Sequence, residues 1–231
     1  MLSMKLAAAI GVLVAAPAVA AAQDPVATLP DAYKLQFEND WVRVVRVHID
    51  AGAHLPTHSH PAALIAYVYL NDADPIVFKH DGGPGTITRP AVKARSYRLS
   101  TGMGERHAIE NNSSTATDYL RIEYKTEGSQ QSRTRRRTPA PPLKTENSVD
   151  VEFTNKVMRI TRITVGAKET LPYDKRAGEP AVMVDLTVFD SGKPSRVAWW
   201  IPPEVKDERL VNDSDQPREY LRFDFLTKPS S

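Results

Sequence analysis

The strongest constraint on the fold is an internal repeat. The segment from Phe37 to Val47 resembles the segment from Phe153 to Ile163, which lies 116 residues further along the chain. Later in the repeat, Asn111 to Arg121 resembles Asn212 to Arg222 at a separation of 101 residues. Chance similarity between two β-rich stretches is the alternative, but two anchors in the same order favour a repeat. The sequence therefore predicts one folding unit that is used twice.

Each copy contains short β-favouring runs separated by turn residues, as at Asn71–Pro75. No stretch keeps a helical period of 3.6 residues with caps at both ends. Closely spaced short strands predict an all-β fold, a sandwich or barrel, in each copy. The expected strands are Val42–Ile49, Leu64–Leu70, Ile76–Phe78, Ala91–Leu99 and Asp118–Tyr124, then Val157–Val165, Ala181–Phe189, Arg196–Ile201 and Glu219–Leu226.

A polar, basic and proline-rich segment joins the copies. It spans residues 126–148 and carries four arginines within Arg133–Arg137, followed by three prolines between Pro139 and Pro142. This composition predicts an extended linker between a first unit at residues 23–125 and a second at 149–231. The arginine run is either a solvated connector or a binding surface for a polyanion or an anionic surface.

The first 22 residues have the pattern of a targeting signal. Lys5 precedes an uncharged apolar run, Leu6–Ala16, and small residues end the segment at Ala20–Ala22. This order predicts a signal peptide over residues 1–22, a mature chain that begins at Gln23, and a periplasmic or secreted protein. An uncleaved N-terminal helix is the alternative. The apolar run is too short for a span of about 20 residues and no second long run follows, so no membrane span is predicted.

Composition removes several classes of function. The chain has no cysteine, which excludes disulfides, thiolate metal sites, iron–sulfur clusters and cysteine nucleophiles. Its 30 Lys and Arg against 28 Asp and Glu leave a net charge of +2, so charge gives no reason to expect a nucleic-acid partner. The sequence has no phosphate-binding P-loop, no Gly-x-Ser-x-Gly elbow and no His-Glu-x-x-His zinc motif.

All six histidines lie in the first copy, between residues 48 and 107. His58 and His60 are two residues apart, a spacing that points both imidazoles to the same face of a strand. A third imidazole from a neighbouring strand would complete a set of ligands inside a barrel. Neutral imidazole binds Zn, Cu, Fe and Ni, so the pattern indicates a divalent transition-metal site.

Two motifs in the first copy resemble those of a known family. Gly52–Pro61, with its His-Ser-His-Pro ending, resembles the first motif of the cupin superfamily, and Gly104–Asn111 resembles the second, Gly-x-x-His-x-x-x-Asn. The resemblance covers Phe37–Tyr124 and, in the second copy, Phe153–Leu226. It implies two jelly-roll β-barrels in tandem, a bicupin, with a divalent metal in the lumen.

Carried over residue by residue, the resemblance implies that His58, His60 and His107 bind one divalent metal, with Zn, Fe, Ni, Mn and Cu all open. The family usually has a glutamate four residues after the second histidine, and this chain has Leu64 there. Three histidines still suffice for a metal site. The alternative is a relic barrel with polar histidines and no metal.

Neighbouring polar residues receive lesser roles. His54 and Glu105 are candidate auxiliary groups, with an exposed loop position as the alternative for His54. His48 is expected on the solvent face of a strand. His80 stands beside a glycine-rich turn, apart from any cluster. Asn111, retained in the second motif, favours an active site.

The second copy has no histidine. The positions that match the three histidines are Asp174, Arg176 and Glu208. An arginine cannot ligate a metal and repels one, and burying it requires a partner. The second barrel is therefore expected to hold no metal, to pair Arg176 with an acid, and to cover the outer surface of the first barrel.

Two functions follow from these expectations. One is a metal-dependent enzyme of the oxygenase, isomerase or lyase type that such barrels support, acting on a small molecule. The other is a non-catalytic protein that binds a small ligand or serves as an accessory. The substrate, the reaction and the presence of a homo-oligomer are all left open by the sequence.

Overall fold

The computed structural model of the chain describes residues 24–102, 104–129, 131–132, 134–174, 179–187, 197–205 and 207–230, and only the backbone of residues 102, 173, 174, 207 and 208. The predicted signal peptide, residues 1–22, lies outside the described residues. Within them, the one helix, α1 (Pro25–Thr28), has four residues, so no described helix has the length to cross a membrane.

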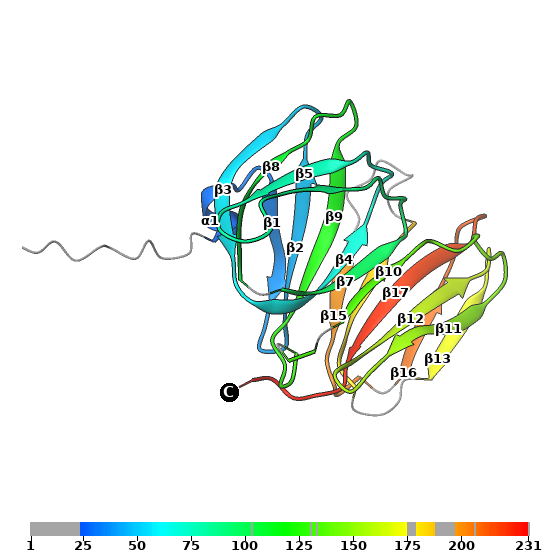
Figure 1. Cartoon of the computed structure of the whole chain (residues 1–231). Coiled ribbons are helices and arrows are strands. Elements are labelled where there is room, and N and C mark those ends of the chain that lie inside the picture. Colours follow the sequence, from blue (N-terminus) through cyan, green and yellow to red (C-terminus); the bar gives the residue numbers. More distant parts are fainter. Residues whose placement is uncertain are drawn as a thin grey trace, which may run out of the picture.

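The described residues also form seventeen strands, grouped into two halves (Figure 1). The first half holds β1 (Tyr33–Glu38), β2 (Val42–Ile49), β3 (His54–His60), β4 (Ala63–Tyr69), β5 (Ile76–His80), β6 (Thr86–Arg89), β7 (Tyr97–Gly102), β8 (Glu105–Glu110), β9 (Thr117–Tyr124) and β10 (Arg135–Thr138). The second half holds β11 (Ser148–Thr154), β12 (Met158–Val165), β13 (Thr170–Asp174), β14 (Ala181–Asp185), β15 (Ala198–Ile201), β16 (Asp207–Val211) and β17 (Arg218–Phe225). The predicted all-β class with two tandem units is confirmed.

Antiparallel sheets build each half. In the first half a six-stranded sheet of order β1-β2-β9-β4-β7-β10 packs against a four-stranded sheet of order β3-β8-β5-β6. In the second half the described strands form a five-stranded sheet of order β11-β12-β17-β14-β15 and a two-stranded sheet of β13 and β16. Side chains from both sheets of the first half fill its interior, which is the lumen of the first barrel.

The large sheets of the two halves pack face to face. Alternation along β2 sends Val45 and Val47 into the lumen, while Val42 and Val44 join a core shared with the second half. That shared core is the largest in the described residues, and it combines β2, β4, β7 and β9 with β12, β14, β15 and β17. The second copy therefore covers the outer face of the first barrel's six-stranded sheet, as the sequence predicts.

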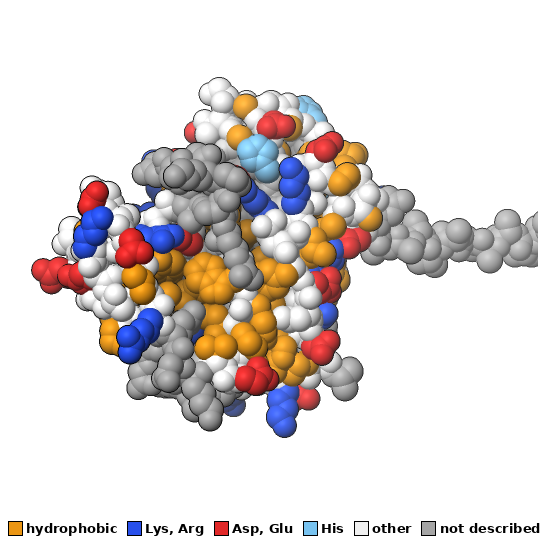
Figure 2. Space-filling view, turned by 180° about the vertical axis from the view of Figure 1, so that it is seen from behind, with side chains coloured by type: hydrophobic (Ala, Val, Ile, Leu, Met, Phe, Trp, Pro, Cys, Tyr) orange, Lys and Arg blue, Asp and Glu red, His pale blue; other side chains and the backbone are white. Residues whose placement is uncertain are grey.

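Polar contacts hold the same junction. Glu219 of the second half is buried and accepts from Arg95 of the first half through both carboxylate oxygens, at 2.6 and 2.8 Å. Arg162 of the second half lies 3.0 Å from the same carboxylate. In Figure 2, hydrophobic side chains gather over the middle of the molecule, where the two halves meet. Trp41 and Trp200 pack across this seam with ring centres 6.2 Å apart.

The segment predicted as a linker contains a strand. Within residues 126–148, β10 pairs with β7 and becomes the edge of the six-stranded sheet, with Arg137 opposite Arg98 and Arg135 opposite Ser100. Part of the arginine run is thus fixed to the first barrel, whereas Arg133 lies outside the described residues. The run belongs to a sheet because β7 offers an unpaired edge that β10 satisfies.

The internal repeat is visible in matching hydrogen bonds. The buried side chain of Asn111 donates to the carbonyls of Asp50 and Thr115, both at 2.9 Å. Asn212 donates to the carbonyls of Gly166 and Gln216 at 2.8 and 2.7 Å in the second half. Asn111 thus ties one loop to the end of β2, and the site role favoured by the sequence motif stays a prediction.

Candidate metal centre

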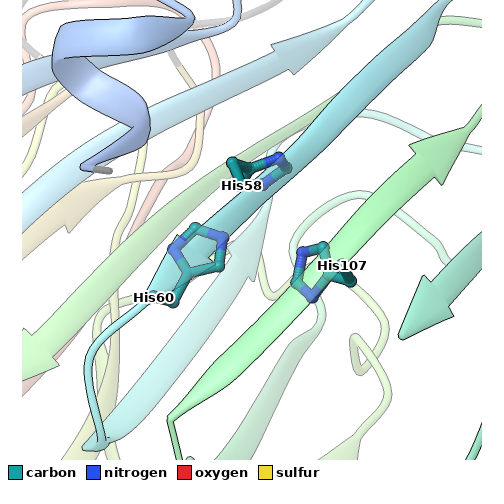
Figure 3. A group of neighbouring side chains, drawn as sticks. All are labelled: His58, His60 and His107. Atoms are coloured by element: carbon teal, nitrogen blue, oxygen red, sulfur yellow. The ribbon is translucent and has the colours of Figure 1, made fainter. Parts of the chain in front are cut away.

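Three histidines meet on the inner face of the four-stranded sheet (Figure 3). His58 and His60 lie two residues apart on β3, and His107 lies directly opposite His58 on β8. Each residue is at most 5% exposed. Nitrogen atoms of the three rings all lie within 4.8 Å of one another. The structure thus brings together the three residues that the sequence singles out.

A β-bulge precedes the first two histidines. The pairing of β3 with β8 shifts between Leu55 and His58, so Pro56 and Thr57 together oppose a single residue of β8. Bulges of this kind re-aim the side chains that follow them. Before the bulge the side chain of His54 is 61% exposed, whereas after it His58 faces the lumen.

Burial keeps the three imidazoles neutral. Loss of solvation lowers the pKa of His58 to about 4 and lowers the pKa of His107. The pKa of His60 is lowered further, by burial first and then by the positive charge of Arg121. All three rings are therefore uncharged at neutral pH, the form in which imidazole ligates a metal.

Hydrogen bonding assigns the proton of His58. Its Nδ1 lies 2.9 Å from the carbonyl oxygen of Pro56, which can only accept, so Nδ1 carries the hydrogen. Its Nε2 is then an acceptor, and the buried hydroxyl of Tyr33 donates to it at 2.8 Å. The Nε2 lone pair, which a metal would use, thus accepts a hydrogen bond from Tyr33. No sequence pattern pointed to Tyr33, which comes from β1, in the opposite sheet.

One ring nitrogen of His107 has no partner among the described residues. Both nitrogens are buried, but Nδ1 faces the carboxylate of Glu105 at 3.4 Å, whereas Nε2 makes no hydrogen bond within the described part of the chain. An unsatisfied buried polar atom costs about 1–3 kcal/mol. A metal bound by the three histidines would satisfy one of these nitrogens, so the residues present fit a metal ion.

Glu105 places a carboxylate beside the cluster, and it comes from β8, not from β4. Glu105 Oε2 lies 3.4 Å from His107 Nδ1. Burial disfavours its ionised form, but the interaction with His107 and the charge of Arg89 outweigh this and lower its pKa to about 2. Leu64 belongs to the core between the halves, on the face of β4 that points away from the lumen. Glu105 therefore occupies the auxiliary position that the sequence offered it.

The expectation for His80 was wrong. His80 pairs with His107 across β5 and β8, and their ring centres lie 5.3 Å apart. Nitrogen and oxygen atoms of His80, Glu105 and His107 form a second group within 4.8 Å. Strand pairing creates this neighbourhood, which linear spacing could not reveal. His48 is half-exposed beside Asp50, as predicted for a solvent-facing residue.

Known structures share this architecture. The sequence matches no protein-family model and no curated protein. Bacterial pirin YhhW from Escherichia coli, in complex with nickel(II), superposes with a TM-score of 0.57 at 18% identity, over 86% of this chain and 91% of that one. Quercetin 2,3-dioxygenase from Acinetobacter baumannii superposes with a TM-score of 0.54 at 11% identity, over 84% of this chain and 76% of that one. The fold is that of a bicupin.

The second half of the chain lacks an equivalent cluster in its sequence, and Arg176 and the side chains of Asp174 and Glu208 lie outside the described residues. Its backbone corrects one correspondence. Glu208 pairs with Tyr173, and Asp174 pairs with Asp207. β13 has no bulge, so Tyr173, not Asp174, takes the strand position of His58.

Proposed function

We propose that this bicupin is a metal-dependent enzyme that acts on a small molecule. Its first barrel binds one divalent transition metal through His58, His60 and His107. The observation that carries the proposal is the convergence of three buried imidazoles, one of which has an Nε2 atom with no hydrogen-bond partner within the described part of the chain. A likeness in fold to a nickel-bound pirin and to a quercetin dioxygenase supports it.

A bound divalent ion would supply a Lewis acid for a carbonyl or carboxylate oxygen. Two residues of the chain prepare the histidine cluster for a metal ion. The ionised carboxylate of Glu105 favours a proton on the Nδ1 atom of His107, which leaves the lone pair of Nε2 in that ring free to bind the metal. The hydroxyl of Tyr33, released from His58, becomes a hydrogen-bond donor inside the lumen. A cavity reaches His60 and gives small molecules access.

Metal analysis tests the proposal. Protein loaded with Co²⁺ or Ni²⁺ is expected to hold one ion per chain, and His58→Ala, His60→Ala and His107→Ala are each expected to lose most of it. His54→Ala is the matched control, since His54 lies on the same strand with an exposed side chain. A change in the visible spectrum of the Co²⁺ protein on adding a candidate substrate would support an open coordination position. Full occupancy in all three variants would contradict the proposal.

We also propose that the chain is exported to the periplasm or beyond. The basic start, short apolar run and alanine-rich end of residues 1–22 support this. N-terminal sequencing of protein from the native host is expected to start at Gln23. A chain that keeps Met1 in the cytoplasm would overturn the export proposal without touching the metal site.

A further inference from the structure

A large basic cavity opens beside the histidine cluster. Its volume is about 870 Å³, and His60, His80 and Glu105 line it on the side of the cluster. Six arginines line the same cavity, whereas the acidic residues in its lining are Asp81 and Glu105. The arginines are Arg89, Arg98, Arg106, Arg135, Arg136 and Arg137. The cavity therefore has a strong local excess of positive charge in a chain that is almost neutral overall.

Only part of this charge is neutralised by the protein. Arg106 pairs with Asp81 at 2.8 Å, and Arg89 lies 3.9 Å from Glu105. Arg98, Arg135 and Arg137 have no carboxylate partner among the described residues. Unpaired guanidinium groups that surround a concave site are typical of oxyanion binding.

Arg98 is the clearest case. Its guanidinium lies 4.0 Å from the ring centre of Tyr67, and its polar neighbours are the hydroxyl groups of Tyr67 and Tyr69. Two of its nitrogens, Nε and Nη2, are buried and make no hydrogen bond within the described residues. The guanidinium therefore has no anionic partner for its charge among the described residues and two nitrogens left to satisfy, and a bound anion would supply both.

β10 places a second arginine beside the first. Arg137 lies directly opposite Arg98 in the pairing of β10 with β7. Tyr97 and Leu99 point into the core between the halves, so Arg98 and Arg137 share the opposite face, toward the lumen. Like charges directly opposite each other on one face destabilise a sheet. An anion bridging the two would remove this cost.

We propose that this cavity is the substrate site and that it binds a small organic oxyanion through Arg98 and Arg137. The statement about the substrate rests on the function proposed above, whereas the anion site itself does not. This proposal gives the arginine run a function, because Arg135–Arg137 form the basic edge of the cavity and are not merely part of a connector. Carboxylate and phosphate groups share the required chemistry, since both accept two parallel N–H bonds from a guanidinium.

Isothermal titration of the full chain, stripped of metal by chelation and dialysis, tests the anion site. Citrate, malonate and inorganic phosphate are the probes at low salt, and at least one is expected to bind with a Kd below 1 mM, weakening as salt rises. Arg98→Gln and Arg137→Gln are each expected to weaken binding about tenfold. Arg209→Gln is the matched control, since Arg209 is an exposed arginine of β16 in the second half. Arg137 is exposed, so its variant is informative even where Arg98→Gln unfolds.

The outcomes separate the two proposals. Anion binding by the stripped chain, together with no uptake of Co²⁺ or Ni²⁺ in the loading experiment, supports the anion site and defeats the metal site. Metal occupancy with no saturable binding of any probe, or equal binding by Arg137→Gln and the parent chain, overturns the anion site alone. Tight binding of a long polyanion such as heparin, with no binding of the small probes, would also overturn it, because the run would then serve a polymer.

Discussion

At the scale of single residues, the hydroxyl of Tyr33 is the group that a metal would displace. In the metal-free protein it satisfies His58 Nε2, so Tyr33→Phe is expected to lower the free energy of unfolding by about 1 kcal/mol. With metal bound, this loss should shrink, since the ion takes over the nitrogen. Urea denaturation of the metal-free and loaded forms measures both values.

Tyr124→Phe is the control for that substitution. The hydroxyl of Tyr124 is buried and has no hydrogen-bond partner within the described residues, so its removal should cost little in either form. Loss of the metal itself in Tyr33→Phe would show that Tyr33 is a ligand, which would contradict the displacement account.

The buried histidines also set the pH dependence of the metal-free protein. The pKa of His58 is about 4 in the folded chain and near 6.5 when unfolded, because burial disfavours the imidazolium. Between these values the unfolded chain binds more protons, so stability falls as pH drops below 6.5. The denaturation midpoint is expected to fall between pH 6.5 and 5, above the range where most carboxylates titrate, and His58→Asn should flatten the slope. A constant midpoint over this interval would contradict the assignment.

Sequence spacing predicted some of these neighbours and missed others. His58 and His60 could be placed on one face because the strand period is two. His107 came from its motif, and nothing in the linear pattern set it opposite His58. Tyr33 and His80 were missed because they reach the cluster from other strands, through pairings and packing that only the folded chain establishes.

At the scale of elements, the loop after β8 is expected to be structural. Asn111→Ala removes hydrogen bonds to three buried or half-buried carbonyls and is expected to cost about 2 kcal/mol of stability. Metal stoichiometry at saturating metal should not change. Asn212→Ala, its counterpart, should destabilise similarly. If Asn111→Ala lost its metal with unchanged stability, Asn111 would instead belong to the metal site.

Prediction of strands succeeded where both faces are buried. β2 and β4 are rich in branched apolar residues and lie inside the six-stranded sheet, so their sequences show them clearly. The strands that the sequence did not predict are mostly polar. They lie at the edges of the large sheets or in the two smaller sheets. β8 has the sequence Glu-Arg-His-Ala-Ile-Glu, and β10 is mostly arginine. Such strands owe their form to a partner strand, not to local preference.

At the scale of the whole molecule, the first barrel is expected to need the second. A fragment that ends at residue 142 keeps β10 and the histidine cluster but exposes the apolar outer face of the six-stranded sheet, with Leu64, Leu120 and Ile122. Exposed patches of this kind cause association. Size-exclusion chromatography with light scattering should show aggregates or dimers. A stable monomer would show that the second barrel is dispensable for solubility.

The core between the halves draws on equivalent positions of the two copies. Val42 and Met158 correspond in the repeat, as do Leu120 and Leu221, and all four meet in that core. The contact is thus isologous, like the interface of a twofold-symmetric dimer, but both partners lie in one chain. In a true dimer every substitution appears on both sides at once. Here a substitution changes one side of the contact alone. The second barrel can therefore lack the histidines and still cover the apolar face of the first barrel.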